Sequence, residues 1–95
     1  MGIVVIRWVS EADMLLRKVK LTGFVKGNEH NEETSRVLLN STLELAEIAQ
    51  KSNGLLIPLS KPPIKENEEF AYFEVIFKEE TSLEMFQRLL KNRLS

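Results

Sequence analysis

Residues 17–26 read RKVKLTGFVK, and their apolar and polar side chains alternate along the stretch. One face carries Val19, Leu21 and Val25, and the other carries Lys18, Lys20, Thr22, Phe24 and Lys26. Because successive side chains of a strand point to opposite faces, this period of two predicts a strand with one buried face. Gly23 falls on the apolar face, where a glycine indicates a bulge or a close approach of two backbones.

The remaining elements follow from similar patterns on both sides of this strand. Residues 70–78 alternate in the same way, with Ala71, Phe73, Val75 and Phe77 between Phe70, Tyr72, Glu74, Ile76 and Lys78. Residues 3–9 are β-branched or aromatic except for Arg7 and predict another strand, followed by a turn or one short helical turn at residues 10–13. Residues 55–59 predict a short strand that either lies at a sheet edge or ends at Pro58. Apolar stripes at helical spacing predict helices over residues 32–52 and 81–94, and Asn53-Gly54 marks the end of the first.

The order of these elements, ββαββα, predicts an α+β fold with one domain spanning residues 1–95. Four short strands and two amphipathic helices favour a two-layer sandwich, in which a largely antiparallel four-stranded sheet carries both helices on one face. The chain has 95 residues, 43% hydrophobic content and a net charge of −1. This length suits one domain, and this composition excludes the class of intrinsically disordered proteins.

The predicted sheet carries more apolar side chains than one helix-covered face requires. We expect the covered face to hold the apolar sets of the two alternating strands, with Ile3 and Val5 beside them. The uncovered face then holds the interface candidates Val4, Ile6, Trp8, Phe24, Phe70, Tyr72 and Ile76. A solvated face of an antiparallel sheet is usually polar, and large exposed apolar patches are typical of contact surfaces. The sequence therefore predicts a non-enzymatic interaction or assembly module that forms a homodimer, or binds another protein, through this face. On this hypothesis Trp8→Glu or Tyr72→Glu disrupts the assembly without unfolding the monomer.

Three alternatives remain open for this face. Lysines beside aromatic rings bind RNA or single-stranded DNA in several sheet proteins, and the corresponding set is Lys18, Lys20, Phe24, Lys26 and Tyr72. The sequence pI of about 5.9 argues against this function, because nucleic-acid-binding domains usually have a pI above about 9. A small-molecule-sensing regulatory domain with its pocket at a dimer interface is another alternative. The third alternative is that the face is not a contact surface, because a loop or the chain's own helices cover Trp8 or Tyr72.

Two polar segments are weaker candidate sites. His30 stands among Asn and Glu residues before the long helix, where a solvated loop and helix cap are favoured over a metal site. In the loop of residues 60–69, Lys61 and Lys65 flank a stiff Pro62-Pro63 pair, and a plain connection is favoured over a site for an acidic partner.

Recognisable catalytic and membrane signals are missing from the sequence. The chain has no cysteine, which excludes disulfides and thiolate chemistry, and it has neither a phosphate-binding glycine loop nor a GxSxG motif. We therefore expect no catalytic residues, no metal and no cofactor. No apolar run approaches the length of a membrane span, and no secretory signal opens the chain. The corresponding expectation is a soluble, cytoplasmic protein with no membrane partner.

Overall fold

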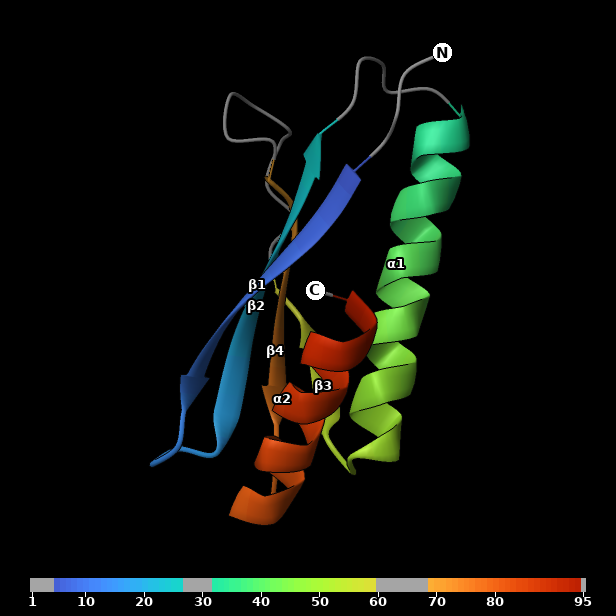
Figure 1. Ribbon diagram of the computed structural model, residues 1–95. Helices are drawn as coiled ribbons and strands as arrows, with labels where there is room; N and C mark the ends of the chain where they lie inside the picture. Colours follow the sequence, from blue (N-terminus) through green and yellow to red (C-terminus); the bar gives the residue numbers. More distant parts are fainter. Residues whose placement is uncertain (1–4, 27–31, 60–68, 95) are drawn as a thin grey trace.

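The computed structural model describes residues 5–26, 32–59 and 69–94 of the chain. Its elements are β1 (Val5–Asp13), β2 (Lys18–Lys26), α1 (Glu32–Lys51), β3 (Leu55–Pro58), β4 (Glu69–Ile76) and α2 (Glu80–Leu94). They confirm the predicted order and the α+β class. The four strands form one sheet in the order β1-β2-β4-β3, and each neighbouring pair is antiparallel (Figure 1). Since β4 separates β2 from β3, those two strands run parallel, and α1 makes the crossover between them.

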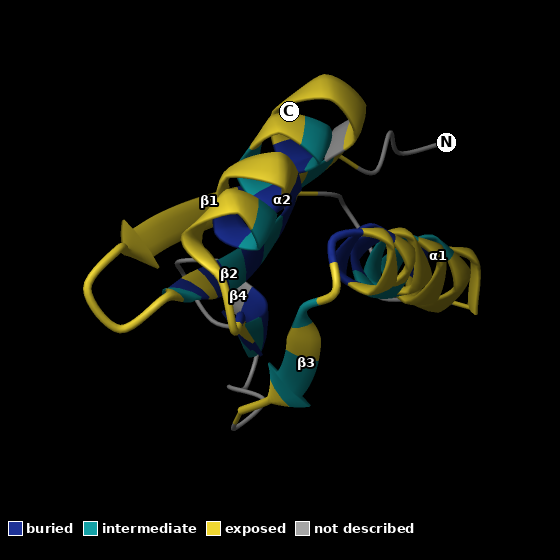
Figure 2. Ribbon diagram, turned by 90° about the horizontal axis from the view of Figure 1, so that it is seen from below, coloured by how far each residue is buried: buried dark blue, intermediate teal, exposed yellow. Residues whose placement is uncertain are grey.

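Both helices cover the same face of the sheet, and the core lies between the two layers (Figure 2). The helices contribute Leu45, Ile48, Ala49, Leu83, Phe86 and Leu90 to this core, all of them buried. The strands contribute Val19, Leu21 and Val25 from β2 and Ala71 and Val75 from β4. Fully burying one large apolar side chain stabilises the folded state by about 1.5–3 kcal/mol, so this layer supplies much of the driving force for folding.

The register of β2 against β4 confirms the helix-covered face predicted for these two strands. Val19 lies opposite Val75, Leu21 opposite Phe73, and Gly23 opposite Ala71. Directly opposed residues of antiparallel strands share a face, so the two apolar sets meet on the helix side. The edge position predicted for the strand with Pro58 is also confirmed, because β3 pairs with β4 alone among the described strands.

The first helix ends at the predicted Asn53-Gly54 signal. Asn53 adopts the left-handed conformation with a φ of 58°. The Gly54 N–H donates to the Ala49 carbonyl at 2.8 Å, and the Asn53 N–H donates to the Gln50 carbonyl at 3.1 Å. This pattern is a Schellman motif, which satisfies the last helical carbonyls and turns the chain into β3.

The first strand is longer than its sequence pattern predicts. Residues 10–13 were expected to form a turn, but they continue β1 as far as Asp13, so this prediction is wrong. Glu11 lies opposite Lys20 and Asp13 opposite Lys18, so opposite charges across the two strands favour the extended pairing. The actual turn follows at residues 14–17, where the Arg17 N–H donates to the Met14 carbonyl at 3.3 Å.

Several sequence predictions fall outside the described residues. They concern Ile3, Val4, His30 and the part of the 60–69 loop that contains Lys61 and Lys65.

Candidate interaction surface

The pairing of β1 with β2 decides which side chains of β1 face the helices. Trp8 lies opposite Gly23, and Ile6 lies opposite Val25, and both partners belong to the helix-covered face of β2. Trp8 is accordingly only 8% exposed, and Ile6 packs against the same core. The predicted placement of Ile6 and Trp8 on the uncovered face is therefore wrong. Val5, predicted for the covered face, lies instead on the outer face and is 54% exposed.

Trp8 is fixed in the core by a polar contact and by two aromatic contacts. Its indole N–H donates to the Ser41 hydroxyl of α1, with 2.8 Å between Nε1 and Oγ. Its ring packs edge-on against Phe70, with centroids 5.3 Å apart, and tilted against Phe73 at 5.8 Å. A buried tryptophan usually has its N–H satisfied in this way. A glutamate at this position would lose all three contacts, so Trp8→Glu is now expected to unfold the monomer.

Phe70 reaches the helix side because β4 contains a bulge. Gly23 pairs with Ala71 and Phe24 pairs with Glu69, so Phe70 is an extra residue in β4. A bulge interrupts the alternation of side chains, and here it brings the neighbours Phe70 and Ala71 to the same covered face. Phe70 is 3% exposed, so its prediction as an interface residue is also wrong.

The outer face, by which we mean the sheet face without helices, retains three of the predicted residues. Phe24 and Tyr72 are half-buried there, and Ile76 is 37% exposed. The register adds four apolar residues that the sequence analysis missed, namely Val5, Val9, Leu55 and Ile57. Leu55 lies directly opposite Ile76 and is 63% exposed, so these two form one apolar patch at the β3–β4 side.

One signal in the sequence pointed to the correct phase of β1. Arg7 has the same parity as Val5 and Val9, and a charged residue in the middle of a strand is expected to face solvent. In the structure the Arg7 guanidinium lies over the Phe24 ring on the outer face, 5.2 Å from its centroid. The missed β3 residues carried no such signal, because a strand of four residues is too short to show alternation.

The lysines of the outer face stand beside carboxylates. Lys18 pairs with Glu74 at 3.9 Å, and Lys20 lies between Glu11 of β1 and Glu74 of β4 in the strand register. Lys26 is exposed at the end of β2. Of the predicted nucleic-acid set, the structure therefore brings Phe24, Tyr72 and the three lysines to one face, but it places acidic side chains among them.

A second apolar feature is the tip of the β1–β2 hairpin. Met14, Leu15 and Leu16 are 40%, 90% and 58% exposed. The turn is held by the Asp13 carboxylate, which accepts the Leu16 N–H at 3.1 Å. The hairpin leans away from both helices toward this tip (Figure 1).

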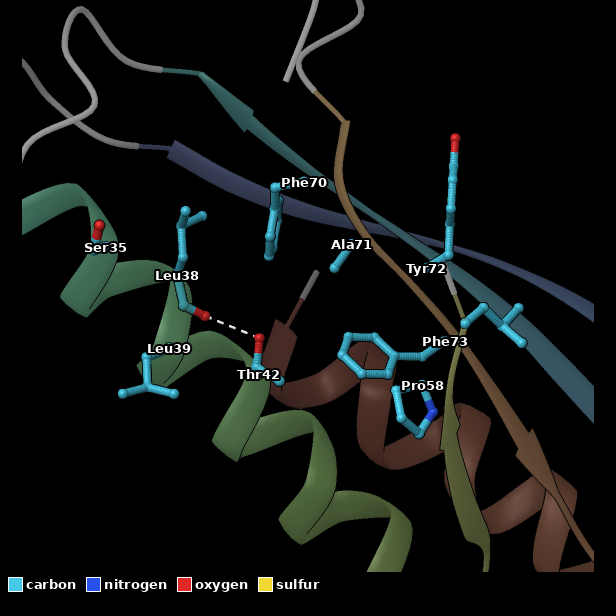
Figure 3. A pocket seen from close by; sticks show the side chains of 10 residues that line it. Ser35, Leu38, Leu39, Thr42, Pro58, Phe70, Ala71, Tyr72 and Phe73 are labelled. Atoms are coloured by element: carbon cyan, nitrogen blue, oxygen red, sulfur yellow. Dashed lines mark hydrogen bonds between the residues drawn. The ribbon is translucent and has the colours of Figure 1, made fainter. Parts of the chain in front are cut away.

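A groove of about 360 Å³ opens between the first half of α1 and strands β3 and β4. Leu38 and Leu39 line it from the helix, and Pro58, Phe70 and Phe73 line it from the strands (Figure 3). The Thr42 hydroxyl in this wall donates to the Leu38 carbonyl at 3.0 Å. The groove has the volume of a small ligand site, and its lining is mainly apolar.

A small charged cluster joins the two helices on the surface. Glu47 accepts from Lys51 at 3.1 Å and from Arg93 at 3.4 Å. The hydrogen bond and charge of Lys51, followed by those of Arg93, lower the pKa of the Glu47 carboxyl from its ordinary 4.5. Within residues 5–26, 32–59 and 69–94 no group of three or more His, Asp or Glu side chains is arranged to hold a metal ion.

Comparisons with protein families, with curated proteins and with solved structures find no match for the chain. In the described part of the chain, neither helix is long and apolar enough to cross a bilayer. The functional assignment therefore rests on the outer face itself.

Proposed function

We propose that this protein is a small non-enzymatic assembly module that forms a homodimer by packing its outer face against that of a second copy. The proposal depends on one observation: apolar side chains from all four strands lie on a sheet face that neither of the two described helices covers. Val5, Val9, Leu55 and Ile76 are between 37% and 63% exposed there. Antiparallel sheets that face water on one side normally carry polar residues at such positions.

The size of the domain gives a physical reason for such an assembly. A domain of this length buries only about 60–65% of the surface of its unfolded chain, so its stability from one core is small. Packing two outer faces together removes further apolar surface from water and stabilises the fold by about 25 cal/mol for each Å² buried. Leu55 and Ile76, which lie opposite each other, are the centre of the expected contact.

Light scattering or sedimentation of the purified protein tests the proposal. At high micromolar concentration we expect at least twice the monomer mass. Leu55→Glu and Ile76→Glu place a carboxylate in the contact and should weaken association at least tenfold. The matched control is Leu43→Glu, because Leu43 is 57% exposed but belongs to α1 on the helix layer. A strict monomer, or equal effects of all three substitutions, would contradict the proposal.

A further inference from the structure

Among the described strands, β1 forms one edge of the sheet. In the described part of the chain β1 pairs with β2 alone, and β1 stands at the end of the strand order. Residues 9–13 of this strand are all exposed (Figure 2). A long edge strand without proline presents unpaired N–H and C=O groups, which form a template for another strand.

The hydrogen bonds of the neighbouring strands show which residues of β1 present these groups. The Leu59 N–H donates to the Tyr72 carbonyl at 2.9 Å, so even-numbered residues of β4 bond toward β3 and its odd-numbered residues bond toward β2. Phe73 and Val75 lie opposite Leu21 and Val19, so the odd-numbered residues of β2 bond toward β4. Even-numbered residues of β2, which lie opposite the odd-numbered residues of β1, therefore bond toward β1. Consequently Ile6, Trp8, Ser10 and Ala12 direct their backbone groups to the free edge, and Val9 directs its own toward β2.

The charges of β1 are arranged symmetrically about Val9. The sequence Arg7-Trp8-Val9-Ser10-Glu11 places one positive and one negative side chain two residues on either side of Val9, on the outer face. If two copies of β1 pair antiparallel around a twofold axis at Val9, Arg7 of each copy lies directly opposite Glu11 of the other. Opposite charges at such cross-strand positions stabilise pairing.

The backbone geometry fits this register. Trp8 then exchanges hydrogen bonds with Ser10 of the second copy, and Ile6 with Ala12 of the second copy. Val9 meets Val9 of the second copy as a non-hydrogen-bonded pair, in which side chains approach most closely. The outward-facing residues of both strands stay on one side, so the two outer faces join into one surface.

Neighbouring registers are less favourable. An axis at Ser10 would place Glu11 opposite an apolar Val9 and Arg7 opposite Asp13. The Asp13 carboxylate already accepts the Leu16 N–H in the turn. An axis at Trp8 would place Arg7 opposite Val9 and Glu11 opposite Val5. An axis between two residues would oppose side chains of different faces.

We infer that β1 is a self-pairing edge, through which two copies of this chain join their sheets into one of eight strands with the twofold axis at Val9. This contact is separate from the face-to-face contact proposed above, because it joins backbone groups at the edge of β1, whereas that contact packs outer-face side chains together and centres on Leu55 and Ile76. The two contacts together would build an assembly larger than a dimer.

A single cysteine at the axis tests the inference, since the natural chain contains none. In a non-hydrogen-bonded pair the Cα atoms are about 4.5 Å apart, which is within the range that a disulfide spans. Val9→Cys should therefore give a covalent dimer under mild oxidation with oxidised glutathione. The matched control is Thr22→Cys, since Thr22 lies opposite Val9 on the outer face but one strand away from the edge. Ser10→Cys tests the neighbouring register.

A charge exchange provides a second measurement. Glu11→Arg alone places like charges opposite each other twice and should weaken edge pairing about tenfold or more. In the double variant Arg7→Glu/Glu11→Arg, opposite charges again face each other across the two copies. The double variant should therefore recover most of the lost edge pairing. These measurements are made in the Leu55→Glu background, which weakens the face contact.

The outcomes separate the two proposals. Cross-linking of Val9→Cys well above both controls, with recovery in the charge-exchanged double variant, supports the edge contact whether or not the faces pack. A wild-type dimer that Leu55→Glu dissociates, with Val9→Cys no more reactive than Thr22→Cys, would overturn the edge contact and leave the proposed function standing. Stronger cross-linking of Ser10→Cys would overturn the register at Val9.

Discussion

The ring of Phe70 occupies the space that a side chain at Gly23 would need. A Cβ built on Gly23 would lie 2.6 Å from Cε1 of Phe70 and 2.8 Å from Cζ3 of Trp8. Both rings are buried and pack against each other, so a side chain at Gly23 would have to displace them from this contact. The absence of a side chain at Gly23 thus allows two aromatic residues from separate strands to meet.

Gly23→Ala should destabilise the fold by about 1–3 kcal/mol, the usual cost of overpacking a core. Denaturant unfolding measures this change. The control is Thr22→Ala on the outer face of the same strand, which should cost less than about 1 kcal/mol. Equal effects of the two substitutions would show that Gly23 is not confined by the rings.

Ser41→Ala should destabilise the protein by about 1–3 kcal/mol, because it leaves the buried indole N–H of Trp8 without its partner. Trp8→Phe removes the N–H donor together with its hydrogen bond, so no buried donor is left without a partner. Because phenylalanine has a smaller ring, this variant also measures the loss of packing. Trp8 is the one tryptophan of the chain, and its fluorescence follows unfolding directly. An unchanged stability of Ser41→Ala would contradict the hydrogen bond.

Glu47 should contribute stability that depends on pH. Its pKa is lowered in the folded state by Lys51 and Arg93, so the folded state favours the ionised carboxylate. The contribution is therefore present above the ordinary value of 4.5 and is lost as the pH falls through the lowered folded-state pKa. Thermal unfolding of wild type and Glu47→Gln should differ slightly at pH 7 and converge at strongly acidic pH. A difference that grows in acid would contradict this sign.

Asn53→Gly should stabilise the protein by about 0.5–1 kcal/mol. Asn53 holds a left-handed backbone conformation with a φ of 58°, which costs glycine less than any residue with a Cβ. Asn53→Ala, with a Cβ and no amide, should destabilise the protein instead. The denaturant midpoints of both variants measure their stabilities. A less stable Asn53→Gly and a more stable Asn53→Ala would show that the backbone at Asn53 is not strained.

Single-stranded nucleic acid should bind only weakly to the outer face, since Glu11 and Glu74 stand beside its lysines. Fluorescence anisotropy with a labelled oligonucleotide, measured at low and then at rising salt, checks this expectation. Tight binding that falls steeply with salt and weakens in Lys20→Glu would instead favour the nucleic-acid function. Glu74→Lys is the converse variant and should raise the affinity.

The pattern of polar and apolar residues along the chain was enough to predict the element order and the covered faces of β2 and β4. In each of these strands the apolar residues alternate with polar ones. Only one of the two faces of the strand can therefore be the buried one. The pattern also identified Phe24, Tyr72 and Ile76 as outward-facing, because they share parity with Lys18, Lys20 and Glu74.

The composition of the rest of the outer face depends on how the strands pair in three dimensions. The first strand carries large apolar side chains in both phases, and Arg7 is the one charge among residues 3–9 that indicates its orientation. Pairing with β2 decides that orientation, because it places Trp8 against Gly23 and Val9 outside. Phe70 changes face through a bulge that exists only when β4 pairs with β2. The charges placed symmetrically around Val9 are visible in the sequence. They suggest pairing between two copies because the strand order places β1 at the edge of the sheet. Local alternation is a short-range property, whereas strand order and register depend on contacts between distant residues.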